Sequence, residues 1–518
     1  MSAAQKAQTD ITDAFGSGAF QRKALFCGQL AGFVFFSHHL AITVLARPVD
    51  HWCSPSPEYV NLSTAEWKNV GIPVEKDGRH SQCLRYDPPL DVEAANRSVE
   101  GCSSWRYDTR AKDDSIVSEW DLVCKQAWIV PFQSAVFMGG SLVLAPMLGQ
   151  TADWTGRRQV VVVAVVAVIG AGCVGLFVRT LISFTLIRFL MAGVAGGVRV
   201  LCMVLLFELS VPKHRTFYCT VMHVGVVLAQ MFVNMLRNVS LNRVQVQASV
   251  MIPTYLLVYL SYIVEESPRW LLAVGKISEA ERLVLWASRL NGLESSVAKR
   301  RWKRAKSLRQ PSNSETSFMD LFLSHVLRSR TIVMSLCWAS LQLSAFPLHH
   351  TLRRTASEWT QLLVGLLQPL AFVGSYALLT RWGRRPIFSC SLFIQGAVGL
   401  LMGISSSLEY RLLENALVVS ANCLAILTSI TSYLYSMELF PTVLRCTGVS
   451  AVCTSGRLCG VVMAIFIHFG LPEREDMAFG VAGAVSVLSG WLACSLPETR
   501  GVVLTETLDK MEAEEQAL

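Results

Sequence analysis

Long apolar runs separated by short charged segments repeat along the whole chain. A run of about 20 residues, at about 1.5 Å per residue of helix, is enough to cross roughly 30 Å of hydrocarbon. Six such runs fall at 24–46, 127–148, 159–178, 181–206, 217–236 and 246–264. Six more fall at 331–348, 360–379, 386–405, 416–436, 448–469 and 477–496. The pattern predicts an all-α membrane protein with twelve transmembrane helices in two six-helix halves.

Two long polar intervals break this rhythm and divide the chain. One interrupts the first half, and the other joins the two halves. The predicted division is an N-terminal segment, 1–23, a first six-helix half, 24–264, which includes the loop 47–125, and a linker, 265–330. A second six-helix half, 331–496, and a C-terminal tail, 497–518, follow. The number of crossings between the two intervals places them on opposite sides of the membrane.

The basic residues of the short loops gather on one side of the membrane. They lie on the same side as Arg22, Lys23 and the basic run 299–304. Lysine and arginine are enriched in cytoplasmic loops. We therefore expect both termini and the interval 265–330 in the cytoplasm, the loop 47–125 outside, and a multi-pass protein of the plasma membrane.

The composition agrees with a membrane protein. The 518 residues are 52% hydrophobic and 16% charged, against about 25% charged in soluble proteins, and the mean hydropathy is +0.41. The net charge of +8 follows from the membrane topology and does not call for a nucleic-acid partner. The sequence has no Walker loop, Cys-x-x-C pair or His-Glu-x-x-His motif, so we expect no enzyme, cofactor, catalytic residue or metal site.

The loop 47–125 carries the features of an extracellular segment. It contains Cys53, Cys83, Cys102 and Cys124, and the glycosylation sequons at Asn61 and Asn96. Four cysteines in an oxidising compartment predict two disulfides, for which three connectivities are open.

Two short motifs occur once in each half. The first motif follows the second run as Gly149-Gln-Thr-Ala-Asp153-Trp-Thr-Gly156-Arg157-Arg158 and the eighth run as Gly383-Arg384-Arg385. The second motif ends the fourth run, from Glu208 to Arg215, and the tenth run, from Glu438 to Arg445. Their similar spacing argues for a duplicated half.

These motifs predict a conformational latch. Glycine allows two helix ends to approach closely, and the charges of Asp153, Arg157 and Arg158 can pair with the region of Glu208 and Arg215. The alternative is that the arginines only mark the cytoplasmic side. The second copy lacks the aspartate, so its latch should be weaker.

Several motifs resemble solute carrier family 22, the organic cation, zwitterion and organic anion transporters of the major facilitator type. They are Cys102-Ser-Ser-Trp-Arg-Tyr-Asp108, Ser118-Glu-Trp-Asp-Leu-Val-Cys124, Glu266-Ser-Pro-Arg-Trp270, Glu438-Leu-Phe-Pro-Thr-Val-Leu-Arg445 and Leu496-Pro-Glu-Thr-Arg500. The resemblance implies a major facilitator fold, a central cavity open alternately to each side, and movement of small organic ions without ATP hydrolysis. It also implies exchange against an intracellular carboxylate.

Arg457 is the main candidate for binding the transported ion. It lies near the middle of the eleventh run, where an arginine costs about 2.5–3.5 kcal/mol unless it faces a wet cavity or a partner. Organic anion transporters of the family carry an arginine at this point, and cation transporters an aspartate. A guanidinium can hold a carboxylate or sulfate in a bidentate fork. A structural pair with a carboxylate is the alternative.

Further candidates lie in the first, fourth and eighth runs. Arg199 and Arg188 share one face of the fourth; we expect Arg188 to be conformational and Arg199 to be a second anion contact or a packing residue. One of His38 and His39 resembles a cavity histidine of anion-type members; the alternative is a histidine satisfied by a backbone carbonyl group. Phe372 stands where such members have a lysine. The expected substrate contacts are Arg457, Arg199, His38 and Phe372.

The helix-seven segment 340–346 lacks the tyrosines that the family usually places at the cavity. The sequence therefore predicts a divergent organic anion transporter. A receptor or regulator on the same fold that does not transport, and a cation or zwitterion transporter, remain the alternatives.

Overall fold

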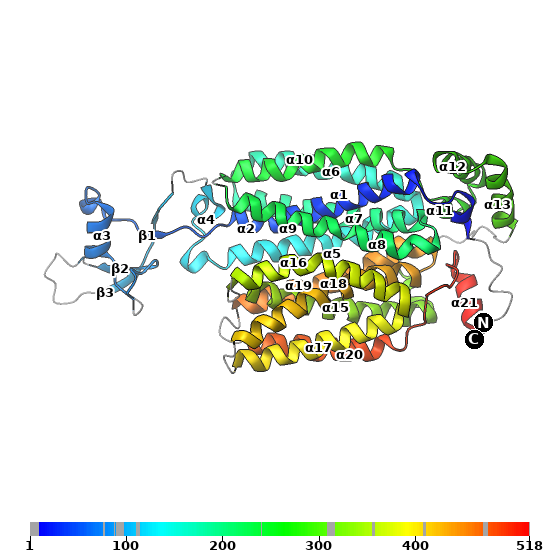
Figure 1. The fold of residues 1–518 in the computed structure, drawn as a ribbon. Coiled ribbons are helices and arrows are strands. Elements are labelled where there is room, and N and C mark those ends of the chain that lie inside the picture. Colours follow the sequence, from blue (N-terminus) through cyan, green and yellow to red (C-terminus); the bar gives the residue numbers. More distant parts are fainter. Residues whose placement is uncertain are drawn as a thin grey trace.

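The chain forms a bundle of long helices with a small loop domain at one end (Figure 1). The computed structural model describes residues 10–75, 78–87, 89, 98–109, 114–239, 241–307, 316–354, 358–407, 411–469 and 475–516. Within these residues, eleven helical segments are long and apolar enough to cross a membrane. This agrees with the predicted all-α membrane fold.

The first half contains six spans. They are α1 (Ala19–Leu40) with α2 (Ile42–Leu45), α5 (Ile129–Thr155), α6 (Arg157–Phe177), α7 (Leu181–Leu209), α8 (Arg215–Met222) with α9 (Val224–Arg237), and α10 (Arg243–Ile263). Two of these bounds differ from the prediction by five residues or more. Helix α1 begins at Ala19 instead of near residue 24, and α5 continues to Thr155 so that Asp153 lies inside it.

The second half contains the other long helices. They are α15 (His325–Arg354), α16 (Glu358–Trp382), α17 (Arg385–Ser407), α18 (Arg411–Leu439), α19 (Arg445–Phe469) and α20 (Glu475–Ala493). Helix α15 is less apolar than the others because Ser335, Ser340, Gln342 and Ser344 interrupt it. It nevertheless packs against α18, α19 and α20, as a seventh span of the bundle must.

The two halves meet mainly along α5 and α19, with α8 against α16. Gly149 of α5 permits this contact, because a Cβ there would lie 2.4 Å from Ser450 Oγ and 2.7 Å from the Cys446 carbonyl oxygen of α19. One large cluster of buried apolar side chains extends through both halves. The halves are therefore in direct contact over much of their length.

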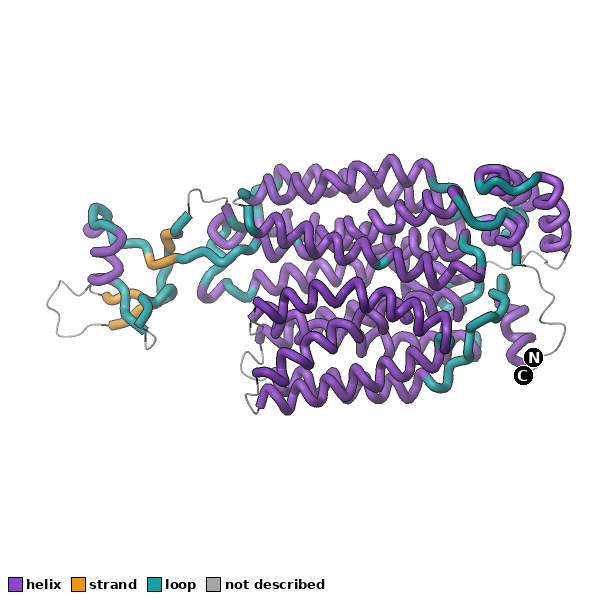
Figure 2. Tube along the Cα trace, in the orientation of Figure 1, coloured by secondary structure: helices purple, strands orange, loops and turns teal. Residues whose placement is uncertain are grey.

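The bundle has two different ends. The loop end, at the left of Figure 1, carries α3 (Thr64–Gly71), α4 (Ile116–Glu119) and the strands, which Figure 2 shows in orange. Strand β1 (His51–Cys53) pairs antiparallel with β4 (Trp105–Tyr107), and β2 (Leu84–Asp87) with β3 (Ser98–Gly101). Ser115 begins α4 and donates to the Arg47 carbonyl oxygen at 2.9 Å, which ties this domain to α2.

The linker end carries short helices and both ends of the described chain (Figure 1). It contains α11 (Pro268–Ala273), α12 (Ile277–Leu290), α13 (Ser295–Ser307), α14 (Asp320–Leu323) and α21 (Leu508–Gln516). The basic run 299–304 of the polar interval 265–330 lies within a helix, α13. In the predicted N-terminal segment, the described residues begin with a turn, Ile11–Ala14, that packs against α13.

The structure selects one of the three connectivities for the loop cysteines. Cys53 is bonded to Cys102, and Cys83 to Cys124. The first bond joins β1 to the segment before β4, and the second joins the loop domain to the start of the second span. Asn61 is exposed, as glycosylation requires; Asn96 lies outside the described residues.

We expect single replacements to free single, defined thiols. Cys83→Ser should leave Cys124 as the new free thiol, and Cys53→Ser should leave Cys102, because each partner has no other sulfur bonded to it. Alkylation without reduction, followed by peptide mapping, measures this. Labelling of Cys102 in the Cys83→Ser variant would contradict the observed connectivity.

Candidate functional site

Arg457 lies at the centre of α19 and reaches across to the other half. Its guanidinium is 4% exposed, and Nη1 donates to the Ser141 carbonyl oxygen of α5 at 2.9 Å. The Phe35 ring of α1 lies 5.6 Å from the guanidinium carbon. Its Nη2 has no hydrogen-bond partner among the described residues.

Arg199 of α7 makes the reciprocal contact. It is 6% exposed, and Nη1 donates to the hydroxyl of Tyr433 in α18 at 2.6 Å. The rings of Phe36 and Tyr433 lie 4.8 Å from its guanidinium carbon. Each half thus sends one arginine to a neutral oxygen of the other half.

Aromatic side chains enclose the two arginines. Tyr433 packs against Trp338 of α15 at 4.6 Å and against His223, between α8 and α9, at 5.3 Å. With Phe35 and Phe36 they form what we call the arginine–aromatic cluster. Aromatic side chains thus surround the two arginines although the segment 340–346 contains no tyrosine.

A glycine makes room for this arrangement. A Cβ at Gly196 of α7 would lie 2.1 Å from Ser141 Oγ and 3.3 Å from Arg457 Nη1. No ion pair between described residues includes Arg199 or Arg457. The expected alternative for Arg457, a structural pair with a carboxylate, is therefore not formed by the described residues.

The other expected substrate contacts are His38 and Phe372, and no hydrogen bond or ring contact between described residues joins either of them to Arg199 or Arg457. His38 is buried inside the first half, with Nε2 3.2 Å from Thr254 Oγ1. The neighbouring residue His39 contacts the arginine–aromatic cluster, since its ring centroid lies 6.5 Å from that of Phe36. Phe372 packs partly buried against the main core, and Arg188 lies over the ring of Phe137 at 5.2 Å.

A buried carboxylate joins the halves at the linker end. Glu208, at the end of α7, lies 2.7 Å from Arg445 Nη1 of the second half and 3.4 Å from Arg157 Nε of the first. All three side chains are 0% exposed. Arg157 also crosses to the second half, where it donates to the Thr442 carbonyl oxygen at 2.6 Å.

Asp153 closes the same end by capping a helix of the opposite half. Its carboxylate accepts from the backbone N–H groups of Thr447 at 2.8 Å and Cys446 at 3.3 Å, in the first turn of α19. It also pairs with Arg157 at 3.0 Å. A carboxylate at a helix N-terminus satisfies unpaired N–H groups and is stabilised by the helix dipole.

The second copy of the motif is built on the same plan. Arg384 pairs with Glu438 at 3.0 Å, and it donates across the halves to Thr216 Oγ1 at 3.1 Å. Glu498 accepts from the backbone N–H groups of Arg384 and Arg385 at 3.0 and 3.1 Å. In this copy Thr380 stands in place of the aspartate, and its hydroxyl donates to the Tyr376 and Ala377 carbonyl oxygens of its own helix.

The same capping occurs in the first copy, where Glu266 accepts from the backbone N–H groups of Arg157 and Arg158 at 3.1 and 3.0 Å. Gly156 and Gly383 precede these arginines with φ of +115° and +97°. A side chain there would be strained, and a Cβ would lie within 2.8 Å of the capping glutamate in both copies. The duplication therefore extends to the capping carboxylates.

Arg215 pairs with Asp10, a partner that the sequence did not indicate. The distance is 2.7 Å, and Asp10 also pairs with Arg269 of α11. Burial alone would raise the pKa of Asp10, but the charges of Arg269 and Arg215 hold it well below its usual range. Arg215 thus fixes the N-terminal segment to the first half and does not pair with Asp153 or Arg157.

Thr316 of the linker lies between the two halves. Its carbonyl oxygen accepts from Trp154 Nε1 of α5 at 2.7 Å, and its hydroxyl donates to the Val443 carbonyl oxygen at 3.1 Å. The backbone N–H of Val443 in turn donates to the Glu506 carbonyl oxygen of the C-terminal segment. Linker and C-terminal segment therefore both reinforce the closed linker end.

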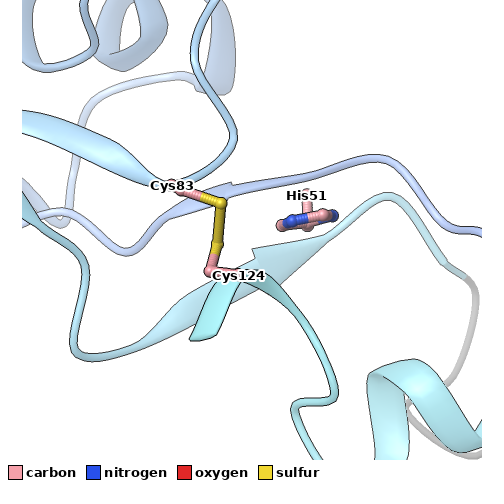
Figure 3. Close-up of side chains that lie close together, drawn as sticks. All are labelled: His51, Cys83 and Cys124. Carbon is pink, nitrogen blue, oxygen red and sulfur yellow. A yellow bond between two sulfur atoms is a disulfide. The ribbon is translucent and has the colours of Figure 1, made fainter. Parts of the chain in front are cut away.

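The loop end contains a cavity of about 580 Å³, lined in part by His51, Cys83 and Cys124. Figure 3 shows the imidazole of His51 beside the bonded sulfur atoms. These three residues lie close enough to suggest a metal site, but the disulfide occupies both sulfur atoms. Only the imidazole is left as a donor, so this group does not fit a metal ion.

Comparison with known proteins agrees with this architecture. The profile of the sugar (and other) transporter family matches residues 94–510. Organic cation/carnitine transporter 2 of Mus musculus is 28% identical over 518 residues, covering 95% of this chain and 92% of that protein. Solute carrier family 22 member 7 of Rattus norvegicus is 28% identical over 531 residues, covering 97% and 98%.

Solved structures show the same fold. The proton:xylose symporter XylE bound to 6-bromo-6-deoxy-D-glucose matches with a TM-score of 0.65 at 15% identity, covering 96% of this chain and 99% of that chain. The human organic anion transporter MFSD10 matches with a TM-score of 0.53 at 16% identity, covering 92% and 100%. The resemblance to solute carrier family 22 is confirmed, and the chain belongs to the sugar (and other) transporter family, as a membrane transporter of the major facilitator fold and not an enzyme.

Proposed function

We propose that this protein moves organic anions across the plasma membrane by alternating access, with Arg457 and Arg199 as the anion contacts. The supporting observation is that two buried guanidiniums on opposite halves meet neutral oxygens, with no acidic partner in the described part of the chain. A carboxylate or sulfate between them would supply the missing negative charge.

The energetics favour an anion at this place. A buried charge without a counter-charge costs several kcal/mol, and an arginine in the membrane interior faces a cavity or a partner. Nη2 of Arg457 still has a donor to offer. The rings of Phe35, Phe36 and Tyr433 around the arginines suit a substrate that carries an aromatic group beside its acid.

The linker-end contacts supply the conformational step of the proposal. Under the positive-inside rule this end is cytoplasmic, so the structure is a state closed toward the cytoplasm. Opening it requires separation of Glu208 from Arg445 and of Asp153 from the first turn of α19. Exchange against an intracellular carboxylate is the expected coupling, because a site that needs an anion to be stable would release one anion and take up another.

Zwitterion transport is the second candidate, since one relative is named a cation/carnitine transporter. The carboxylate of a zwitterionic substrate would meet the same arginines. The cationic end of that substrate would need an acidic partner, and no carboxylate of the described residues contacts the arginine–aromatic cluster. A receptor that binds anions without moving them is the remaining alternative.

Replacement of Arg457 should abolish most of the transport. Loss of a hydrogen bond to a charged group costs about 1.5–3 kcal/mol, so Arg457→Gln should lower uptake efficiency for aromatic carboxylates about 10- to 100-fold. Arg457→Lys should lose less, because it keeps the charge but not the fork. Uptake of labelled aromatic carboxylates and sulfate esters into cells, corrected for surface expression, measures this.

Arg500→Gln is the matched control, because Arg500 lies at the linker end, far from the cluster in sequence, and bonds the Arg381 carbonyl oxygen. It should transport as the parent does. Equal uptake by the Arg457→Gln variant, or uptake of organic cations by the parent, would refute the anion assignment. Binding without uptake would favour the receptor.

Thr316→Val should loosen the linker end. The change removes the hydroxyl that donates to the Val443 carbonyl oxygen, and a net loss of about 0.5–1.5 kcal/mol predicts roughly two- to tenfold more of the open state. Cys446 is fully buried between the halves in the closed state. In a background with Cys446 as the remaining free cysteine, its labelling by a soluble maleimide should accelerate by that factor.

Ser317→Ala provides the comparison, since Ser317 is the adjacent, exposed hydroxyl of the same segment. Its labelling rate should match that of the parent. Unchanged labelling in Thr316→Val, with the protein folded, would show that Thr316 does not hold the two halves together.

A further inference from the structure

Helix α13 presents a dense basic surface at the linker end. It contains six basic residues and no acidic one, and all six are exposed: Lys299, Arg300, Arg301, Lys303, Arg304 and Lys306. The opposite face is buried, through Ala298, Trp302 and Ala305. The charges are therefore displayed on one side of a helix that is anchored on the other.

The anchoring is specific. Trp302 is 1% exposed, and α13 packs against the N-terminal turn Ile11–Ala14. Arg301 Nη1 donates to the Asp13 carbonyl oxygen at 2.9 Å. The basic residues are thus held in position by the folded linker, unlike those of a solvated tail.

The charge of Arg301 acts on the nearby Asp13 carboxylate, but the other five charges have no acidic partner among the ion pairs of the described residues. The acidic helix α21 is engaged elsewhere, with Glu515 on Arg330 at 2.5 Å and Glu512 on Ser324 at 2.6 Å. The exposed charges of α13 are therefore accessible to an external anionic partner.

The neighbouring helix α12 packs against the start of the membrane span α1. Its Trp286 is 38% exposed and packs against Phe20, in the first turn of the membrane span α1, at 5.7 Å. Lys23 of α1 lies over the Trp286 ring at 5.6 Å. Tryptophan and lysine side chains that meet beside the start of a span are typical of the headgroup level.

We propose that α13, with the adjoining outer face of α12, binds the headgroups of anionic phospholipids. Under the orientation proposed above, this is the cytoplasmic leaflet, which is rich in anionic lipid. An acidic protein segment could match the charge of α13 but would not explain the exposed Trp286 beside α1. The inference does not depend on which substrate is carried.

The attraction should be large enough to measure. A basic residue near an anionic membrane contributes about 1 kcal/mol, roughly a fivefold change in equilibrium constant, and the effect fades over a Debye length. Four neutralised cations should therefore remove most of the binding.

The test uses the full chain in nanodiscs of phosphatidylcholine, with or without about one-fifth phosphatidylserine. Backbone hydrogen exchange of residues 295–307 should be slowed about fivefold or more by phosphatidylserine. In K299Q/R300Q/K303Q/R304Q this difference should disappear, while Arg301 and Trp302 keep the helix docked. R106Q/K125Q, which removes exposed cations at the loop end, should retain it.

Equal exchange of the parent in both lipids would overturn the proposal. So would a lipid effect that survives in the quadruple variant, because the charge of α13 would then not be its cause. Slowing by soluble inositol hexakisphosphate in phosphatidylcholine discs, without slowing by phosphatidylserine, would assign the surface to a soluble polyanion instead. Uptake of anions is read separately, so failure here leaves the transport proposal standing.

Discussion

The closed linker end depends on the ion pairs that the Glu208 carboxylate forms with Arg157 and Arg445. The carboxylate is fully buried and lies between Arg157 of its own half and Arg445 of the other. Removing one member of such a group leaves an uncompensated buried charge, which costs about 3–5 kcal/mol. The halves can separate only if water or new partners solvate these groups together, so the linker end should be either closed or open and rarely intermediate.

Helix α19 connects this closure to the proposed binding site. Its first turn is capped by Asp153 and its centre carries Arg457. Movement of α19 away from α5 would therefore break the cap and also draw Arg457 from the Ser141 carbonyl oxygen. An anion held by Arg457 and Arg199 bridges the same two halves, which gives a physical reason for substrate to affect the movement.

Much of this architecture could be predicted from the sequence, because the bilayer thickness sets the length of each transmembrane helix. Charged residues near the membrane must also face water, a cavity or an ionic partner. The apolar runs and the pairing of Arg157 with Glu208 follow from those constraints. The rotation of each helix does not, so His38 was expected at the cavity and instead contacts Thr254. Tyr433 and Phe36 could not be told from lipid-facing aromatics. Asp10 and Thr316 act through contacts with residues far along the chain, which leave no local pattern.

Calorimetric binding of an aromatic carboxylate and of its neutral carboxamide to the purified protein tests the central claim most directly. The two ligands share shape and aromatic surface and differ in charge. If the paired arginines form an anion site, the carboxylate binds at least about tenfold more tightly, consistent with about 1.5–3 kcal/mol for a charged hydrogen bond, and the difference vanishes in an Arg199→Gln, Arg457→Gln variant. Equal affinities for the two ligands, or tighter binding of the corresponding amine, would contradict the account.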